Sequence, residues 1–319
     1  MLRDVPGAET TPATGHITPT GRVIDALRSE FNREESRTAW LFATPALVYF
    51  CIFTGFPVVY GLYLSLYDWR LTASSGTFIG AENYRELLSS PSFLTAVVNT
   101  GYFTAGLMSC VIVFSFLAAT VLNQPIRKIT VLRGVFYSPA VTSVVAISIV
   151  WLWILDPEYG LINKSLLLLG IDGPRWLADS RWALPGLVLT AAWRSIGYFA
   201  VVYLAGLQGI DQTYYEAASI DGANWFGRFR HITVPLLMPT TFFVVVMSVI
   251  WSFQVFPLIY VMTKGGPAGS TSVIVFYLYE QAFIHFRLGY ASAVAYVLFA
   301  ILFFFTVVQF RFLGKHTEV

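Results

Sequence analysis

The chain contains six apolar stretches, each long enough to cross a lipid bilayer. A helix of about 20 apolar residues spans a hydrocarbon core of about 30 Å. Such stretches lie at residues 40–66, 94–122, 134–155, 184–207, 235–262 and 289–310. Only 12% of all residues are charged, against about 25% in soluble domains, and mean hydropathy is +0.65. The sequence therefore predicts an all-α polytopic membrane protein with six transmembrane helices.

The termini differ from this apolar part. Residues 1–38 are expected to form an N-terminal tail, which is rich in Pro, Thr and Gly over its first 20 residues. Within it, apolar side chains at helical spacing over residues 21–37 predict an interfacial helix. The first apolar stretch is too long for a cleaved signal peptide. Residues 39–313 would form the membrane domain, and residues 314–319 a short C-terminal tail.

Several classes of function are excluded by what the sequence lacks. A net charge of +2 gives no basis for nucleic-acid binding. Cys51 and Cys110 lie inside apolar stretches, and the four His residues are scattered, so no metal site is predicted. The apolar stretches contain no Asp or Glu, and the chain has no P-loop motif for ATP. The chain is therefore not expected to be an enzyme or to hold a cofactor.

One polar segment, residues 208–234, separates the fourth and fifth apolar stretches. Thr213 and Glu216 have the spacing of a capping box, which predicts a helix beginning at Tyr214. Gly222 can end that helix in a left-handed conformation, and Asp221 would cap a second short helix. A simple surface hairpin on the membrane is the alternative interpretation.

The same segment resembles the coupling loop of binding-protein-dependent ABC importers. The matching positions are Glu216, Ala217, Ala218, Gly222, Ile232 and Pro235. The one departure is Val234, where the family pattern has Leu. The resemblance implies that these six residues contact a cytoplasmic ATPase and couple its cycle to transport.

The resemblance continues over nearly the whole chain after residue 40, as at Phe78-Ile79-Gly80 and Gly265-Gly266-Pro267. It is closest to the first, maltose-permease-like subunit of the maltose, oligosaccharide and glycerol-3-phosphate importers. It implies a type I ABC importer permease fold in the cytoplasmic (inner) membrane of a prokaryote, with both termini cytoplasmic. The implied partners are a second permease subunit, ATP-binding subunits that hold the ATP, an extracytoplasmic solute-binding protein and membrane lipid. Counts of basic residues alone decide this orientation only weakly.

One charged residue, Arg194, lies inside an apolar stretch. It is about ten residues, or about 15 Å, from the outer end of the fourth stretch, near the middle of the hydrocarbon core. Such a charge usually faces a cavity or a partner. Tyr198 shares its helical face. The resemblance places Arg194, Ser195, Tyr198, Phe253 and Gln254 in the substrate pathway. A structural Arg194 bonded to carbonyls of a neighbouring helix is the alternative.

The substrate stays open between two classes. Aromatic and amide side chains favour a neutral oligosaccharide, whose hydroxyls need hydrogen bonds once dehydrated. Arg194 would instead suit the phosphate of glycerol-3-phosphate or a glycerophosphodiester. A self-sufficient channel or secondary transporter is a further alternative. However, a secondary transporter usually uses intramembrane acids, and a channel leaves the coupling-loop pattern unexplained.

Overall fold

A computed structural model describes residues 33–125 and 127–313 of the chain. The predicted C-terminal tail lies outside the described residues, as does most of the predicted interfacial helix at 21–37. The chain divides into two compact units, Met1–Tyr60 and Gly61–Val319, and each is described by itself.

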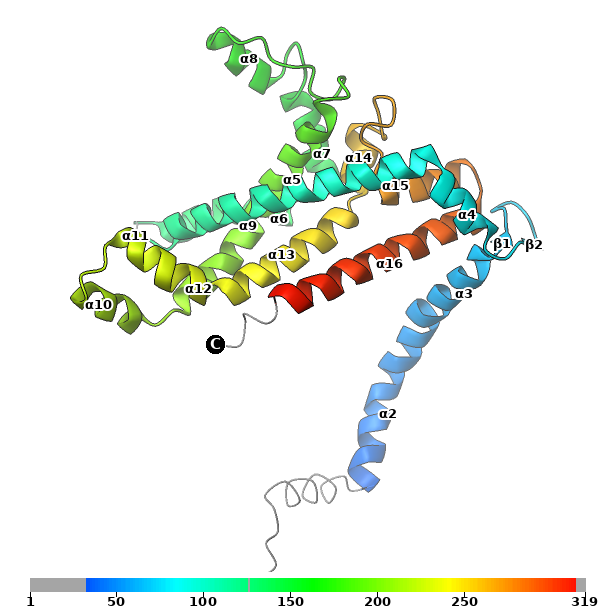
Figure 1. The fold of residues 1–319 in the computed structure, drawn as a ribbon, viewed down its shortest axis with the longest axis horizontal. Coiled ribbons are helices and arrows are strands. Elements are labelled where there is room, and N and C mark those ends of the chain that lie inside the picture. The colour runs from blue at the N-terminus through cyan, green and yellow to red at the C-terminus, as the bar shows by residue number, and fades with distance from the viewer. Residues whose placement is uncertain (1–32, 126, 314–319) are drawn as a thin grey trace, which may run out of the picture. The chain divides into compact units, whose positions relative to one another are not determined.

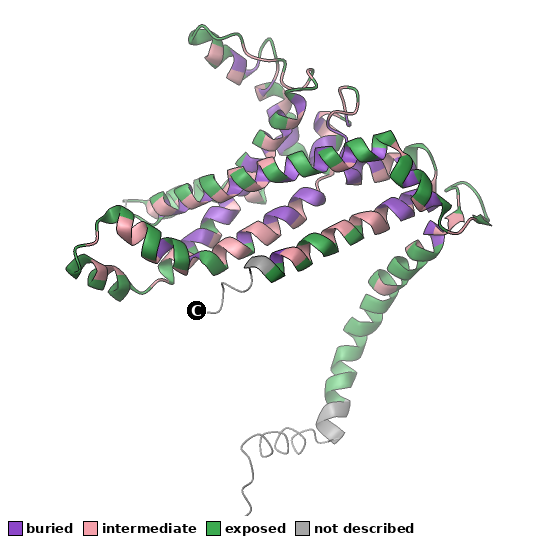
Figure 2. Cartoon of the chain, in the orientation of Figure 1, coloured by how far each residue is buried: buried purple, intermediate pink, exposed green. Residues whose placement is uncertain are grey.

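The described part of the first unit is helical and apolar. It comprises α2 (Arg33–Phe50), the π-helical turn η1 (Cys51–Gly55) and the first residues of α3 (Phe56–Ser65). The apolar run Thr38–Ser65 is long enough to cross a membrane, yet only 6% of its most apolar window is buried within the protein. Figure 2 shows this run as almost entirely exposed. An apolar helix that buries so little is suited to a lipid or partner environment.

The second unit is a helical bundle with one small hairpin of strands β1 (Tyr67–Asp68) and β2 (Thr77–Phe78). Figure 1 shows α10 and α11 at one end of this unit and α4 at the opposite end. Its remaining elements are α4 (Glu82–Ser89), α5 (Pro91–Leu122), α6 (Ile129–Val141), α7 (Val144–Ile154), α8 (Leu161–Leu168), α9 (Ala183–Gln208), α10 (Gln212–Ile220), α11 (Trp225–Arg228), η2 (Phe229–Thr233), α12 (Val234–Leu236), α13 (Met238–Phe253), α14 (Pro257–Met262), α15 (Ile274–Tyr279), η3 (Glu280–Ile284) and α16 (Leu288–Leu313).

The core of the second unit is built on the contact between α5 and α9, which also pack against α6 and α13. Fully buried side chains such as Phe103 and Val111 of α5 meet Phe199 and Tyr203 of α9 in one apolar cluster. A second cluster joins α4, α5, α13, α15 and α16 around Phe93 and Val294. Burying large apolar side chains of this kind holds the helices in fixed positions.

The third predicted stretch is a broken helix rather than a straight one. α6 and α7 meet at 98°, because Pro139 has no N–H to donate and Thr142 is extended. The Ser138 hydroxyl donates to the Val135 carbonyl (3.0 Å), which is the group that the missing N–H would have satisfied. Hydroxyl groups therefore replace part of the backbone ladder at the break.

The fifth predicted stretch is also interrupted. A 61° bend precedes α13 at Leu237, and α13 ends at Phe253, before α14 begins at Pro257. Pro239 and Pro257 each start a new helix, where a missing N–H costs nothing. The described residues hold four helices long enough to span a membrane, or up to six when each bent pair counts as one.

Candidate functional site

A small cavity of about 220 Å³ lies among α5, α7, α9 and the break after α13. Its polar side chains are Thr190, Arg194, Ser195 and Gln254, with the ring of Trp251 beside them. Apolar side chains, including that of Phe103, complete the wall. The structure thus brings together Arg194, Ser195 and Gln254, three residues predicted for the substrate pathway.

The guanidinium of Arg194 has no partner within the described residues. Its Nε atom is buried without a hydrogen bond, and the ion pair of the described ranges, Glu86 with Arg287, does not involve it. The carbonyl bonds expected of a structural arginine are not present in this part of the chain. The side chain as a whole is half-buried and lines the cavity, so its terminal N–H groups are free to bond something in the cavity.

Tyr198 and Phe253 lie beside the cavity rather than in its wall. The Tyr198 ring packs on Trp251 with centroids 5.0 Å apart, so it supports a wall residue. Phe253 is 5% exposed and packs on Phe305 of α16. Trp251, which the sequence reasoning missed, lines the cavity instead. Its spacing of three residues from Gln254 could have found it, because such residues share a helical face.

The backbone is irregular where Gln254 enters the cavity. Gln254 is the C-cap residue of α13, and the chain does not resume a helix until Pro257. At membrane depth, such irregular backbone is tolerated where it lines a cavity or is buried in protein. The break therefore lies where Gln254, Val255 and Pro257 line the cavity.

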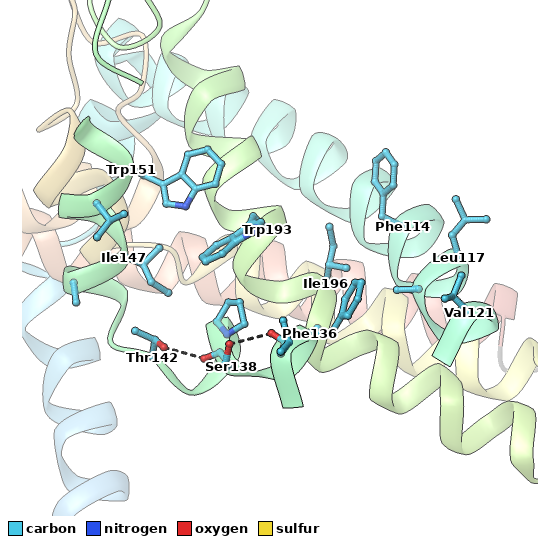
Figure 3. Close-up of a pocket in the computed structure, with 16 residues that line it drawn as sticks. Phe114, Leu117, Val121, Phe136, Ser138, Thr142, Ile147, Trp151, Trp193 and Ile196 are labelled. Atoms are coloured by element: carbon cyan, nitrogen blue, oxygen red, sulfur yellow. Dashed lines mark hydrogen bonds between the residues drawn. The ribbon is translucent and has the colours of Figure 1, made fainter. Parts of the chain in front are cut away.

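A larger and open apolar groove of about 850 Å³ (Figure 3) shares a lining residue with this cavity. Phe114, Leu117 and Val121 of α5 line one part of it, and Trp151 and Trp193 line another. Ile147 contributes to both the groove and the small cavity. One side chain of α7 therefore forms part of both walls.

The segment between α9 and α13 folds as two short helices, with caps that differ from the predicted ones. Asp211, not Thr213, caps α10: its carboxylate accepts the Thr213 N–H (2.9 Å), which holds the pKa of Asp211 below its usual value. The helix consequently begins at Gln212 rather than Tyr214. Asn224, not Asp221, caps α11 by accepting the Gly227 N–H at 2.8 Å. In both cases the residue directly before the helix supplies the side-chain acceptor for the free N–H groups.

Gly222 ends α10 as predicted. Its φ is +80°, and the Ala223 N–H reaches back to the Ala218 carbonyl at 2.9 Å, as in a helix-ending left-handed turn. Two further bonds tie the two short helices into one piece: Arg228 to the Ser219 hydroxyl (3.0 Å) and Tyr215 to Thr233 (3.0 Å).

The outer surface of this piece is exposed and partly apolar. Ile220 is 87% exposed and Trp225 is 71% exposed. Glu216 and Ala217 are exposed, Ala218 is half-buried, Ile232 lies half-buried in η2, and Pro235 is exposed in α12. The Glu216 carboxylate makes no hydrogen bond within the described residues. The six predicted coupling residues thus lie between α10 and α12 at one end of the unit, on a segment that is largely exposed.

Comparison with known proteins decides the family. Residues 111–316 match the model of the binding-protein-dependent transport system inner membrane component. The chain belongs to this family. The permease is 36% identical to a probable ABC transporter permease protein, YurN, of Bacillus subtilis (strain 168), over 88% of this chain and 97% of the relative. It is 35% identical to the lactose transport system permease protein LacF of Rhizobium radiobacter, over 85% of this chain and 92% of the relative.

A solved structure has the same fold. It is that of a bacterial alginate ABC transporter in complex with an alginate pentasaccharide-bound periplasmic protein. The match has a TM-score of 0.78 at 23% identity, and covers 90% of this permease and 98% of that chain. The predicted all-α importer-permease fold and the predicted family are therefore confirmed. The permease is an integral membrane component rather than a catalytic one.

Proposed function

We propose that this permease, paired with a second permease subunit, forms the pathway by which a carbohydrate enters the cell. The observation that carries the proposal is the cavity that joins Arg194, Ser195 and Gln254 beside the Trp251 ring. Sugar recognition combines hydrogen-bonding side chains with an apolar ring face. The names of relatives agree, since one transports lactose and another arabino-oligosaccharides.

A phosphorylated solute is the second candidate, and one observation favours it. The Arg194 guanidinium has no anionic partner in the described residues, and arginine binds phosphate through paired hydrogen bonds. Glycerol-3-phosphate or a glycerophosphodiester would supply that anion. Measuring uptake of neutral sugars and of phosphorylated solutes under the same conditions can therefore distinguish the two candidates.

The ATPase is proposed to dock on the α10–α11 segment, with ATP bound by that partner and not by the permease. Exposed Ile220 and Trp225 beside the exposed Glu216 would fill a groove on the ATPase. Such docking would put α10, α11 and both termini in the cytoplasm. The permease itself would lie in the inner membrane of a prokaryote. A solute-binding protein would then dock at the α4 end of the bundle from the extracytoplasmic side.

The apolar groove that contains Trp151 and Trp193 is proposed to face the second permease or lipid. Its lining is almost wholly apolar, and it is open to the surroundings. Such a surface is suited to another apolar helix or to acyl chains. Movement of α7 at this contact would also move Ile147 in the wall of the cavity, and so would link the two spaces.

Transport by the reconstituted complex tests the proposal. The permease would be assembled in proteoliposomes with its candidate second permease, ATPase and solute-binding protein. ATP-dependent uptake of malto-, arabino- and galacto-oligosaccharides would be compared with uptake of glycerol-3-phosphate and glycerophosphocholine. Uptake of a sugar supports the proposal, and uptake of only the phosphorylated solutes supports the second candidate. Uptake of any of these solutes by the permease alone would contradict an ATP-driven importer.

A further inference from the structure

A second polar cavity lies at the α4 end of the bundle, apart from the Arg194 cavity. It has a volume of about 350 Å³, at the lower end of the range of about 300–1,000 Å³ for ligand sites. It lies between the start of α5, the loop of residues 263–273, and α15 with η3. The side chains that bear its polar groups are Ser92, Thr95, Lys264, Ser272, Tyr277, Glu280, Gln281 and His285.

The loop that forms one wall is held in a fixed shape by α5. The Asn99 amide donates to the carbonyls of Gly269 (3.0 Å) and Ser272 (2.9 Å). The Thr100 hydroxyl accepts the Ile274 N–H at 3.0 Å. Both α5 side chains are buried. A site whose walls are already ordered loses little entropy when a ligand binds.

Two side chains in this cavity have unmet hydrogen-bonding capacity. Gln281 is 9% exposed, and its amide makes no hydrogen bond to any residue in the described ranges. Ser272 is 8% exposed, and its hydroxyl is also without a partner there. Buried amides and hydroxyls are nearly always bonded, because leaving them unpaired costs free energy. An occupant of the cavity would supply a partner for the Gln281 amide, whereas the Ser272 hydroxyl oxygen is too deeply buried to reach it.

The charges around the cavity favour a neutral occupant. Glu280 faces it together with Lys264 and His285, and none of the three forms an ion pair within the described chain. Burial raises the pKa of the Glu280 carboxyl, and His285 partly opposes the effect. An anion would be repelled by Glu280, and a cation by Lys264. Donors and acceptors that alternate around a small space instead suit a neutral ligand with several hydroxyls.

We propose that this cavity is a second sugar site of the permease, which holds one unit of a neutral carbohydrate before the solute reaches the Arg194 cavity. The proposal rests on the proposed carbohydrate function and adds to it a separate recognition step. Gln281 and Glu280 would bind adjacent hydroxyls, and Thr95 would lie at the rim. Position at the α4 end would let a sugar reach this site from the side on which the binding protein docks.

Protection of an introduced thiol tests the site directly. In a Cys51→Ser, Cys110→Ser background, Thr95→Cys places a thiol at the cavity, where the native threonine is exposed. The full complex in proteoliposomes would be labelled from outside with a membrane-impermeant maleimide, with and without maltotriose, xylotriose or arabinotriose. Uptake of the same sugars would be measured in parallel. Ser165→Cys on α8, also exposed and away from the cavity, is the control thiol.

At a trisaccharide concentration of about ten times its Kd, labelling of Thr95→Cys should slow about tenfold, and labelling of Ser165→Cys should not change. Adding Gln281→Leu should weaken that protection about two- to tenfold. Sugar uptake without any protection at Thr95→Cys would overturn the second site and leave the carbohydrate function standing. Absence of both uptake and protection would overturn both. Protection that requires the binding protein but no sugar would also overturn the site, because the cavity would then be a protein contact.

Discussion

Arg287 and Glu86, 201 residues apart in the chain, are joined by two parallel hydrogen bonds of 2.7 and 2.6 Å. The guanidinium of Arg287 also lies 4.4 Å from the centre of the Tyr290 ring. The pair thus connects α4 to the start of α16. Paired geometry of this kind is the most favourable form of an otherwise weak surface ion pair.

The Glu86–Arg287 pair should make stability depend on pH. The hydrogen bonds from Arg287 hold the pKa of Glu86 below its usual value. A depressed carboxyl pKa stabilises the folded state above the unfolded pKa of about 4.3, and this contribution is lost as pH falls through the folded pKa. Melting temperatures measured in detergent from pH 7 to pH 3 should fall further for the native permease than for Glu86→Gln. Parallel curves for the two proteins would contradict this role.

Arg194 should be needed for transport and not for folding. Arg194→Ala should reduce solute uptake at least tenfold while assembly and basal ATP hydrolysis stay largely intact, because no bond within the described chain is lost. For a phosphorylated solute, Arg194→Gln should impair uptake far more than for a neutral sugar, since Gln keeps donors and loses the charge. Uptake per assembled complex and melting temperature would be measured together. A destabilised complex with normal uptake per molecule would assign Arg194 a structural role.

Substitution of Trp251 should mainly reduce uptake, whereas substitution of Phe253, two residues away, should mainly reduce stability. Trp251→Leu removes a ring from the cavity wall and should lower uptake severalfold. Phe253→Leu should leave the cavity wall unchanged. It should loosen the contact with Phe305 and cost about 1 kcal/mol or more of stability. Initial uptake rates and thermal unfolding of both variants provide the measurement. If Phe253→Leu proves the more harmful to uptake, the assignment of the wall is wrong.

Glu216 should be needed for docking of the ATPase and not for folding of the permease. Its carboxylate is exposed and unbonded within the described chain, so Glu216→Lys should insert and fold normally. The reversed charge should nevertheless abolish solute-stimulated ATP hydrolysis and co-purification of the ATPase. Gly222→Val should have the same effect by another route, because a β-branched residue at φ +80° is strained by about 1–3 kcal/mol. Gly222→Asn is the control, since Asn tolerates this conformation. Normal transport by both Glu216→Lys and Gly222→Val would remove the coupling assignment.

Gly197 should be intolerant of any side chain. A Cβ at this position would overlap the backbone carbonyl of Phe136, whereas one at Gly134 would meet open space. Gly197→Ala should therefore separate α6 from α9 and destabilise the permease by about 1–3 kcal/mol, while Gly134→Ala should be nearly neutral. Thermal unfolding of the two variants, purified identically, decides the matter. Equal stabilities would contradict the close α6–α9 contact.

The sequence allowed the positions of the apolar stretches to be predicted, since these follow from composition over 20 residues. Their interruptions could not be predicted in the same way. The break between α6 and α7 depends on how the Ser138 hydroxyl satisfies a carbonyl beside Pro139, and hydropathy does not register such a bond. The same limit applies to the end of α13, where the chain remains apolar from Phe253 to Pro257 except at Gln254.

The polar segment was predictable in outline and not in its caps. Gly222 was predictable because glycine readily adopts the left-handed conformation that ends a helix. Asp211 and Thr213, in contrast, both have side chains that can cap a helix. Which of them does so depends on where the preceding helix α9 ends. For the cavity, resemblance supplied Arg194, Ser195 and Gln254, but the choice between Trp251 and Phe253 depended on the rotation of α13. That rotation is set by packing against α5 and α16.

The nearly unburied apolar run Thr38–Ser65 has a consequence for what stability means in this permease. Most of its surface is apolar and exposed within the described residues, so its free energy depends strongly on what surrounds it. Bilayer thickness, detergent and any partner subunit would each enter the measured value as a bound ligand does. A melting temperature for the isolated chain therefore describes the chain together with its surroundings, and two preparations can be compared only when those surroundings are the same.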